Sequence, residues 1–152
     1  MKKIITVICM ILLLGGCSKS APAVFEDACW GMSMKEVKAT RQEGDIVDGP
    51  SENVLNYIQA SDTKLFPGRT VTVAYVFTDD KLTGITVQLF TGENETAEAA
   101  MKDTEEALTA QYGAKTEEDD RLIWQTEQSK IELTPLSGSK TSYIVLFSPL
   151  EK

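Results

Sequence analysis

Apolar and polar residues alternate along two stretches of the chain, 70–78 and 82–90, with the two-residue period of a half-buried strand. The three residues between them, Asp79-Asp80-Lys81, have the composition of a tight turn. The pattern therefore predicts an antiparallel hairpin in which each strand buries one face. That buried face is predicted to carry Val71, Val73, Tyr75, Phe77, Ile85, Val87 and Leu89.

Shorter runs rich in β-branched and aromatic residues predict further strands at 54–59, 122–126, 130–134 and 143–148. The segment 61–69 interrupts this series, because Pro67-Gly68 gives it the chemistry of a turn. The same segment carries two neighbouring apolar residues for which the pattern shows no burial partner. These residues, Leu65 and Phe66, are candidates for an exposed contact with a partner.

Two helices are predicted from start and stop signals. Ser33, followed three residues later by Glu36, forms a capping box, and Gly44 is a natural stop, so the first helix has about ten residues. The second helix begins after Gly92 and stops at Gly113. Its apolar or small residues recur every three or four positions, at Ala97, Ala100, Met101, Thr104, Leu108 and Tyr112.

The predicted elements follow the order α-β-β-β-α-β-β-β. This order predicts an α+β domain with an antiparallel sheet of about six strands and two helices on one of its faces. The two halves repeat the order, and Leu55-Asn56-Tyr57 follows the first helix as Leu122-Ile123-Trp124 follows the second. The echo suggests an internal duplication, and chance explains so short a match nearly as well.

The first residues form a leader that is separate from this domain. Lys2 and Lys3 precede an apolar run too short to span the roughly 30 Å hydrocarbon core of a membrane, which suits a signal peptide. The run ends in Leu14-Gly15-Gly16-Cys17, which resembles the lipobox of bacterial lipoproteins. The resemblance implies cleavage between Gly16 and Cys17 and attachment of lipid to Cys17. An ordinary secretory signal with a chance cysteine is the alternative.

The leader divides the chain into three parts. Residues 1–16 are predicted to be a cleaved lipoprotein signal peptide, 17–24 a lipidated tether and 25–152 a single α+β domain. The polar part of this tether is the six residues 18–23, which, at most about 3.5 Å each, hold the domain within about 20 Å of the lipid surface. We therefore expect a cell-envelope protein anchored to a membrane that faces the periplasm or the cell exterior, which is the outer membrane in a diderm.

Composition narrows the classes of function. After cleavage, 13 basic and 23 acidic residues leave a net charge of −10, which disfavours nucleic acid and anionic head groups. The membrane contact is then the covalent lipid on Cys17. The sequence contains no histidine, so histidine-dependent catalysis and imidazole metal ligation are excluded. Pairs of carboxylates are better explained as a solvated surface, and we expect no enzyme, no metal and no cofactor.

Three remaining features each have two interpretations. Cys29 is left alone once Cys9 is cleaved off and Cys17 is acylated, so it is an inert buried thiol or a reactive one. The acidic stretch 117–120 is a solvated turn or a calcium ligand, and it lacks the spacing of a calcium-binding loop. Trp30 and Trp124 belong to the core or line a ligand pocket.

Three short runs in this order resemble small uncharacterised bacterial envelope lipoproteins. They are Trp30-Gly31-Met32-Ser33 with Glu36-Val37, the Tyr-x-Phe strand at 75–77 and the helix end 108–113. A looser likeness, limited to Gly31-Met32-Ser33 and Val37, is to modules of the SmpA/OmlA type and of the β-lactamase-inhibitor-protein fold. These likenesses imply a non-catalytic module that binds a protein or acts in envelope assembly. A small-ligand or solute-binding lipoprotein is the alternative.

Overall fold

The computed structural model describes residues 22–60 and 63–150, so the predicted signal peptide, its predicted cleavage site after Gly16 and Cys17, the predicted acceptor of lipid, lie outside the described residues. No helix in the described ranges is long and apolar enough to cross a membrane. The elements in chain order are α1 (Met34–Lys38), β1 (Ile46–Asp48), β2 (Val54–Ala60), β3 (Val71–Thr78), β4 (Lys81–Phe90), α2 (Ala97–Tyr112), β5 (Thr116–Glu118), β6 (Arg121–Gln125), β7 (Ser129–Pro135) and β8 (Ser142–Pro149).

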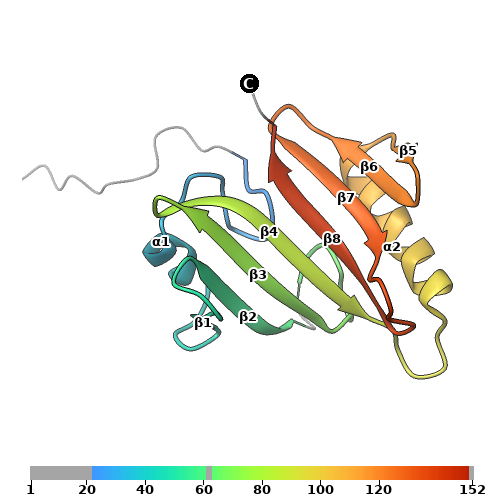
Figure 1. Ribbon diagram of the computed structural model, residues 1–152, viewed down its shortest axis with the longest axis horizontal. Helices are drawn as coiled ribbons and strands as arrows, with labels where there is room; N and C mark the ends of the chain where they lie inside the picture. Colours follow the sequence, from blue (N-terminus) through green and yellow to red (C-terminus); the bar gives the residue numbers. More distant parts are fainter. Residues whose placement is uncertain (1–21, 61–62, 151–152) are drawn as a thin grey trace, which may run out of the picture.

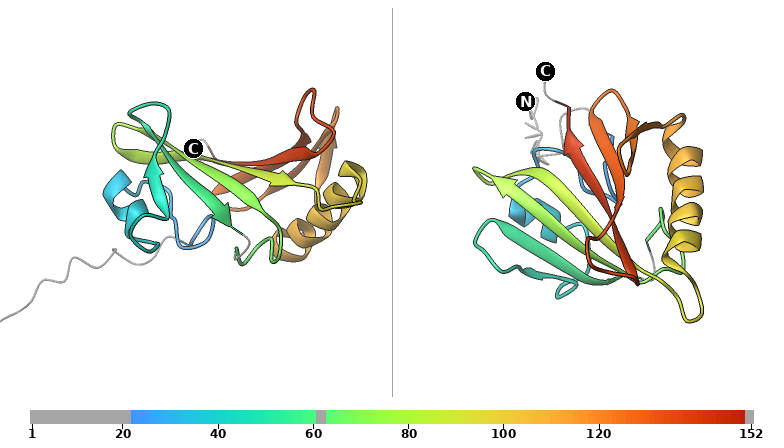
Figure 2. Two further views of the ribbon diagram at one scale, coloured as in Figure 1. Left: turned by 90° about the horizontal axis from the view of Figure 1, so that it is seen from below. Right: turned by 45° about the vertical axis from the view of Figure 1, so that its right-hand side comes forward.

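All strands belong to one antiparallel sheet of eight strands, in the order β1-β2-β3-β4-β8-β7-β6-β5 (Figure 1). Each half of the chain is thus a helix followed by a four-strand meander, and the halves join where β4 pairs with β8. Both helices lie on the same side of the sheet, and the sheet curves so that its other face is concave (Figure 2). The predicted α+β class and antiparallel sheet are confirmed, with two more strands than expected.

The two additional strands are the three-residue edge strands β1 and β5. A strand this short carries too little alternation to be recognised in the sequence. In the structure each is held by pairing to a longer neighbour, with Val47 opposite Asn56 in one case and Glu117 opposite Leu122 in the other. The repeated helix and four-strand meander is the arrangement that an internal duplication would produce.

The core lies between the sheet and its helix layer. In β3 the alternating residues are at most 2% exposed, and their partners in β4 are equally buried. Trp124 is fully buried, and its indole Nε1 donates to the hydroxyl of Thr109 on α2 at 3.3 Å, so its assignment to the core is confirmed. Trp30 is partly buried against the core, and its Nε1 donates to Ser129 Oγ at 2.9 Å.

The first helix is shorter than predicted. The capping box forms as expected, because Ser33 and Glu36 exchange side-chain and backbone hydrogen bonds. The helix then ends after five residues, and the hydroxyl of Thr40 donates to the carbonyl of Val37 at 2.7 Å, which competes with a further helical turn. Val37 is the residue that this helix buries completely.

The segment before α1 completes this half of the helix layer. Val24, the last residue of the predicted tether, is only 8% exposed, and its N–H donates to the carbonyl of Ala28 at 2.7 Å. The next residue, Phe25, packs its ring against Phe147 of β8 with 5.7 Å between the ring centroids. Val24 therefore packs with the core of the folded domain.

Candidate functional site

The loop 63–69 does not present its apolar pair in the way we predicted. Phe66 is 2% exposed, and its ring lies 6.4 Å from that of Phe25, so it belongs to the core and is not an exposed contact. The sequence pattern missed this partner because it comes from a segment about forty residues earlier. Leu65 is partly buried and lines a surface cavity, and its contact with a partner stays a prediction.

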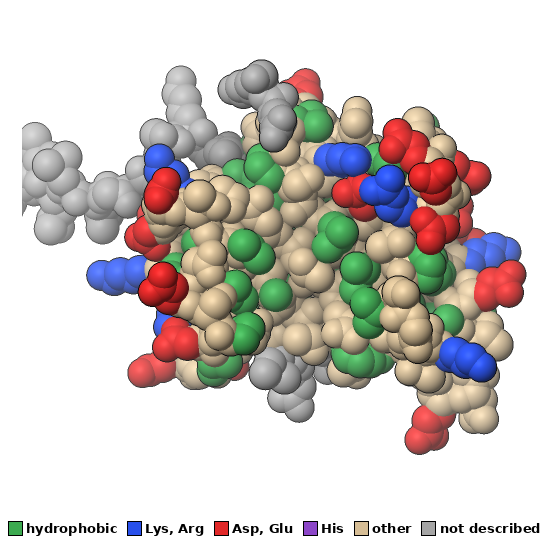
Figure 3. All heavy atoms as spheres, in the orientation of Figure 1, with side chains coloured by type: hydrophobic (Ala, Val, Ile, Leu, Met, Phe, Trp, Pro, Cys, Tyr) green, Lys and Arg blue, Asp and Glu red, His purple; other side chains and the backbone are tan. Residues whose placement is uncertain are grey.

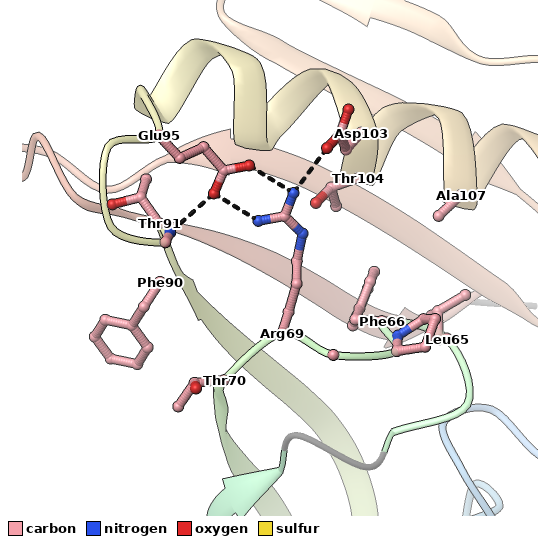
Figure 4. A pocket seen from close by; sticks show the side chains of 13 residues that line it. Leu65, Phe66, Arg69, Thr70, Phe90, Thr91, Glu95, Asp103, Thr104 and Ala107 are labelled. Carbon is pink, nitrogen blue, oxygen red and sulfur yellow. Dashed lines mark hydrogen bonds and ion pairs between the residues drawn. The ribbon is translucent and has the colours of Figure 1, made fainter.

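That cavity, of about 540 Å³, lies between the loop and the stretch from Glu95 to Ala107, which enters α2 (Figure 4). Arg69 occupies its polar side. The guanidinium donates to both carboxylate oxygens of Glu95, at 2.9 and 3.0 Å, and to Asp103 at 3.0 Å. Glu95 also accepts from the backbone N–H of Gly92 at 2.9 Å. Arginine and its two carboxylates therefore satisfy one another, and the cavity presents no unpaired cation to an anionic ligand.

The charges in this cavity stabilise one another. The hydrogen bonds from Arg69, aided by that from Gly92, lower the pKa of Glu95 to about 2. The same pairing with Glu95 raises the pKa of Arg69. Deeper in, burial raises the pKa of Tyr143, whose hydroxyl lies 2.9 Å from that of Thr104. None of these groups is poised to exchange a proton near neutral pH.

Two further cavities extend the first along α2. One of about 480 Å³ shares Leu65, Pro67 and Ala107 with it, and one of about 300 Å³ adjoins the second through Val24 and Tyr112. Together they form an open groove, which we call the α2 groove, between α2 and the segments that fill the centre of the helix layer. Its lining mixes apolar and polar residues, so it is less apolar than a typical ligand pocket.

Neither of the two helices in the described ranges lies on the opposite face of the sheet, which we call the helix-free face. Strand register carries one row of side chains on this face across the whole sheet without interruption. The row consists of Val47, Asn56, Ala74, Thr86, Leu146, Glu132, Ile123 and Thr116. A surface this wide offers a continuous platform instead of a pocket.

Among the side chains that the structure describes, the middle of this face carries no charged one, although a quarter of the residues in the chain are charged. We call this middle, which spans β2, β3, β4 and β8, the neutral patch. All of its members are partly exposed: Val54, Asn56, Thr72, Ala74, Val76, Thr86, Gln88, Ile144 and Leu146. An antiparallel sheet face in contact with water alone is normally polar, so the apolar members of the patch call for another explanation.

The large apolar side chains that are exposed also lie on this face. Among the described residues only Val47 and Phe90 are both large, hydrophobic and exposed, at 42% and 37%. Register places both on the helix-free face. Val47 pairs with Asn56 of the neutral patch, and Phe90 lies two residues after Gln88 in β4, so it shares the face of Gln88. In the close-up, the ring of Phe90 points away from the Arg69 ion pairs (Figure 4).

Charged side chains gather at the two ends of the helix-free face, as the space-filling view shows (Figure 3). At one end Glu132 accepts from both Arg121 and Lys130 at 3.1 Å. The turn beyond these residues carries exposed Glu118, Asp119 and Asp120. The turns at the other end carry exposed Glu52, Asp79 and Asp80.

The remaining candidate residues add no further site within the described part of the chain. The stretch 117–120 is exposed in the β5–β6 hairpin, where Glu117 accepts from Lys115 at 2.7 Å, as expected of a solvated turn. No group of three or more acidic, cysteine or histidine side chains in the described ranges could hold a metal ion. Cys29 is partly buried, and its backbone N–H donates to the sulfur of Met32 at 3.4 Å.

The chain matches no protein-family model, no curated protein and no solved structure.

Proposed function

We propose that the protein is a non-catalytic binding module of the bacterial cell envelope, anchored through lipid on Cys17, that holds a protein partner on the helix-free face. The observation that carries this proposal is the neutral patch. It is an uncharged, partly apolar surface, open to solvent, in the middle of an acidic molecule. Exposed apolar patches of this kind mark surfaces that contact other proteins.

The structure of the patch suits binding. Thr72, Ala74, Val76 and Thr86 are short or β-branched, so little side-chain entropy is lost when a partner covers them. The strands beneath them belong to the middle of the sheet and are fixed by pairing on both sides. Binding therefore costs a rigid surface of short side chains less conformational entropy than a surface of long, mobile ones.

Photocrosslinking in intact cells tests the partner surface. A benzoylphenylalanine residue is placed at Thr72 or Gln88 on the neutral patch, and at Lys102 or Glu106 on the exposed side of α2 as matched controls. We expect a discrete adduct from the two patch positions and none of that mass from the controls. The partner-binding proposal fails if the patch positions yield no adduct, or if all four positions yield the same one.

Membrane attachment has its own test. Because Cys17 is the proposed acceptor of lipid, the Cys17→Ala variant should no longer incorporate labelled palmitate. It should also be found in the soluble fraction of lysed cells without detergent, whereas the parent needs detergent to leave the membrane. A Cys29→Ala variant is the matched control and should retain both properties. Labelling that persists in the Cys17→Ala variant would contradict the anchor.

A small-ligand carrier is the second candidate, and the α2 groove is the observation that favours it. The groove holds three adjoining cavities along one helix. Ala107 lines two of them, so an Ala107→Trp substitution would fill the centre of the groove. A carrier would bind the neutral apolar dye N-phenyl-1-naphthylamine, and this variant would abolish that binding. The partner-binding account expects no such saturable binding.

A further inference from the structure

We infer that the partner is a folded protein whose contacting surface is neutral at its centre and basic at its margins. This inference rests on the proposed function, because it concerns the same helix-free face. Two properties of that face support the inference, its area and its distribution of charge. The net charge of the molecule is the third observation.

Area identifies a folded protein as the occupant. Eight strands spaced about 4.8 Å apart span about 38 Å, and about six residues along each strand span about 20 Å. The face therefore offers about 760 Å², close to the roughly 800 Å² that each partner contributes to a standard protein interface. A small ligand would leave most of this surface exposed. Val47 at the β1 edge and Phe90 at the end of β4 place exposed apolar side chains far apart on the same surface.

Charge distribution defines the chemistry of the partner. A charged group seated over the neutral patch would lose its hydration and gain no counter-charge, so the centre of the partner must be neutral. At the two ends of the helix-free face, which we call its margins, Asp79, Asp119 and Asp120 are exposed. No ion pair among the described residues engages them. Lysine or arginine side chains on the rim of the partner would face these carboxylates.

Net charge disfavours the other occupants. A second copy of this chain would bring the same acidic margins, and the overall charge of −10 predicted after cleavage would repel it. Anionic lipid head groups and nucleic acid are repelled for the same reason. A basic-rimmed protein is attracted instead, and its association should be accelerated by electrostatic steering.

The test neutralises the margins without changing their backbone. The margin variant combines Asp79→Asn, Asp119→Asn and Asp120→Asn, because asparagine tolerates the positive φ angles of 50° and 55° observed at Asp79 and Asp119. The control variant combines Glu93→Gln, Glu98→Gln and Glu106→Gln, which removes the same charge from exposed residues at and before α2. Both carry the photoreactive residue at Thr72, and the initial rate of adduct formation is measured in detergent-solubilised membranes.

We expect the margin variant to form the adduct roughly three- to ten-fold more slowly than the parent, and the control variant less than about two-fold more slowly. We also expect the rate for the parent to fall as KCl rises from about 50 to about 300 mM, and less so for the margin variant. Mass spectrometry should place the crosslink on another protein, in a neutral segment with basic residues nearby.

Opposite outcomes separate the two proposals. An adduct whose rate does not depend on salt, with equal rates for the margin and control variants, would overturn the basic-rimmed partner and leave the binding face intact. A crosslink to a second copy of the chain would also overturn it. Absence of any adduct from Thr72 and Gln88 would overturn the proposed function itself.

Discussion

The guanidinium of Arg69 binds Glu95 through two hydrogen bonds of 2.9 and 3.0 Å, and this pair joins the loop 63–69 to the start of α2. The pair is partly shielded, with side-chain exposures of 18% for arginine and 23% for glutamate. A bidentate, partly shielded pair holds its geometry better than an exposed one. It fixes the position of the helix that covers the second half of the sheet.

The Arg69→Gln substitution should therefore lower the free energy of unfolding by about 1–2 kcal/mol, because two carboxylates lose their common partner. Lys64→Gln is the matched control, since the pair of Lys64 with Asp27 is largely exposed. Its effect should stay below about 0.5 kcal/mol. Urea denaturation of both variants measures the difference, and equal effects would contradict the structural role of the Arg69 pair.

The same pair predicts a dependence on pH. Because the pKa of Glu95 is lowered in the folded state from 4.5 to about 2, its contribution is fully present above about pH 4.5. That contribution is lost as the pH falls through the interval down to about 2. The difference in unfolding free energy between the parent and the Glu95→Gln variant should be constant above about pH 5 and shrink below it. A difference that grows on acidification would contradict the assignment.

A buried hydroxyl pair joins the middle of α2 to β8. The hydroxyls of Tyr143 and Thr104 lie 2.9 Å apart, and both groups reach the carbonyl of Ala100. Tyr143→Phe and Thr104→Val should each cost about 1–2 kcal/mol of stability. The double variant should cost less than the sum of the two, because neither polar group is then left without the other. Strict additivity in thermal or urea unfolding would contradict this coupling.

Phe66 and Leu65 should differ in their contribution to stability. Phe66 is buried against Phe25, so Phe66→Ala should cost about 3–5 kcal/mol by opening a cavity in the core. Leu65 is only partly buried, and Leu65→Ala should cost less than about 1.5 kcal/mol. Urea denaturation measures both, and similar values for the two variants would contradict the arrangement of this loop.

The long strands and the second helix were predictable from the sequence because their patterns are local. The hairpin of β3 and β4 follows the two-residue period, and α2 lies between a cap at Thr96 and a stop at Gly113, close to the predicted limits. Features that depend on distant contacts were not predictable. The burial of Phe66 requires Phe25, and edge strand β5 takes its structure from β6 rather than from its own acidic residues.

The helix-free face was missed for a related reason. Thr72, Ala74 and Val76 alternate with the buried residues of β3, so the two-residue period places them on the other face of the strand. Their neutral character was visible along β3 alone. Its continuation across β2, β4 and β8 depends on the strand order, which the sequence does not specify, and the uncharged patch appears only when the sheet is assembled.

The most direct test of the account places one charge at the centre of the neutral patch. Thr86 lies there, opposite Ala74 and Leu146, and Ala99 is an exposed residue of α2 that serves as the matched control. The Thr86→Arg variant should keep the unfolding temperature of the parent within a few degrees and lose at least about ten-fold in yield of the partner adduct formed from Gln88. The Ala99→Arg variant should keep both. An adduct yield that is unchanged in Thr86→Arg would contradict the claim that this face holds the partner.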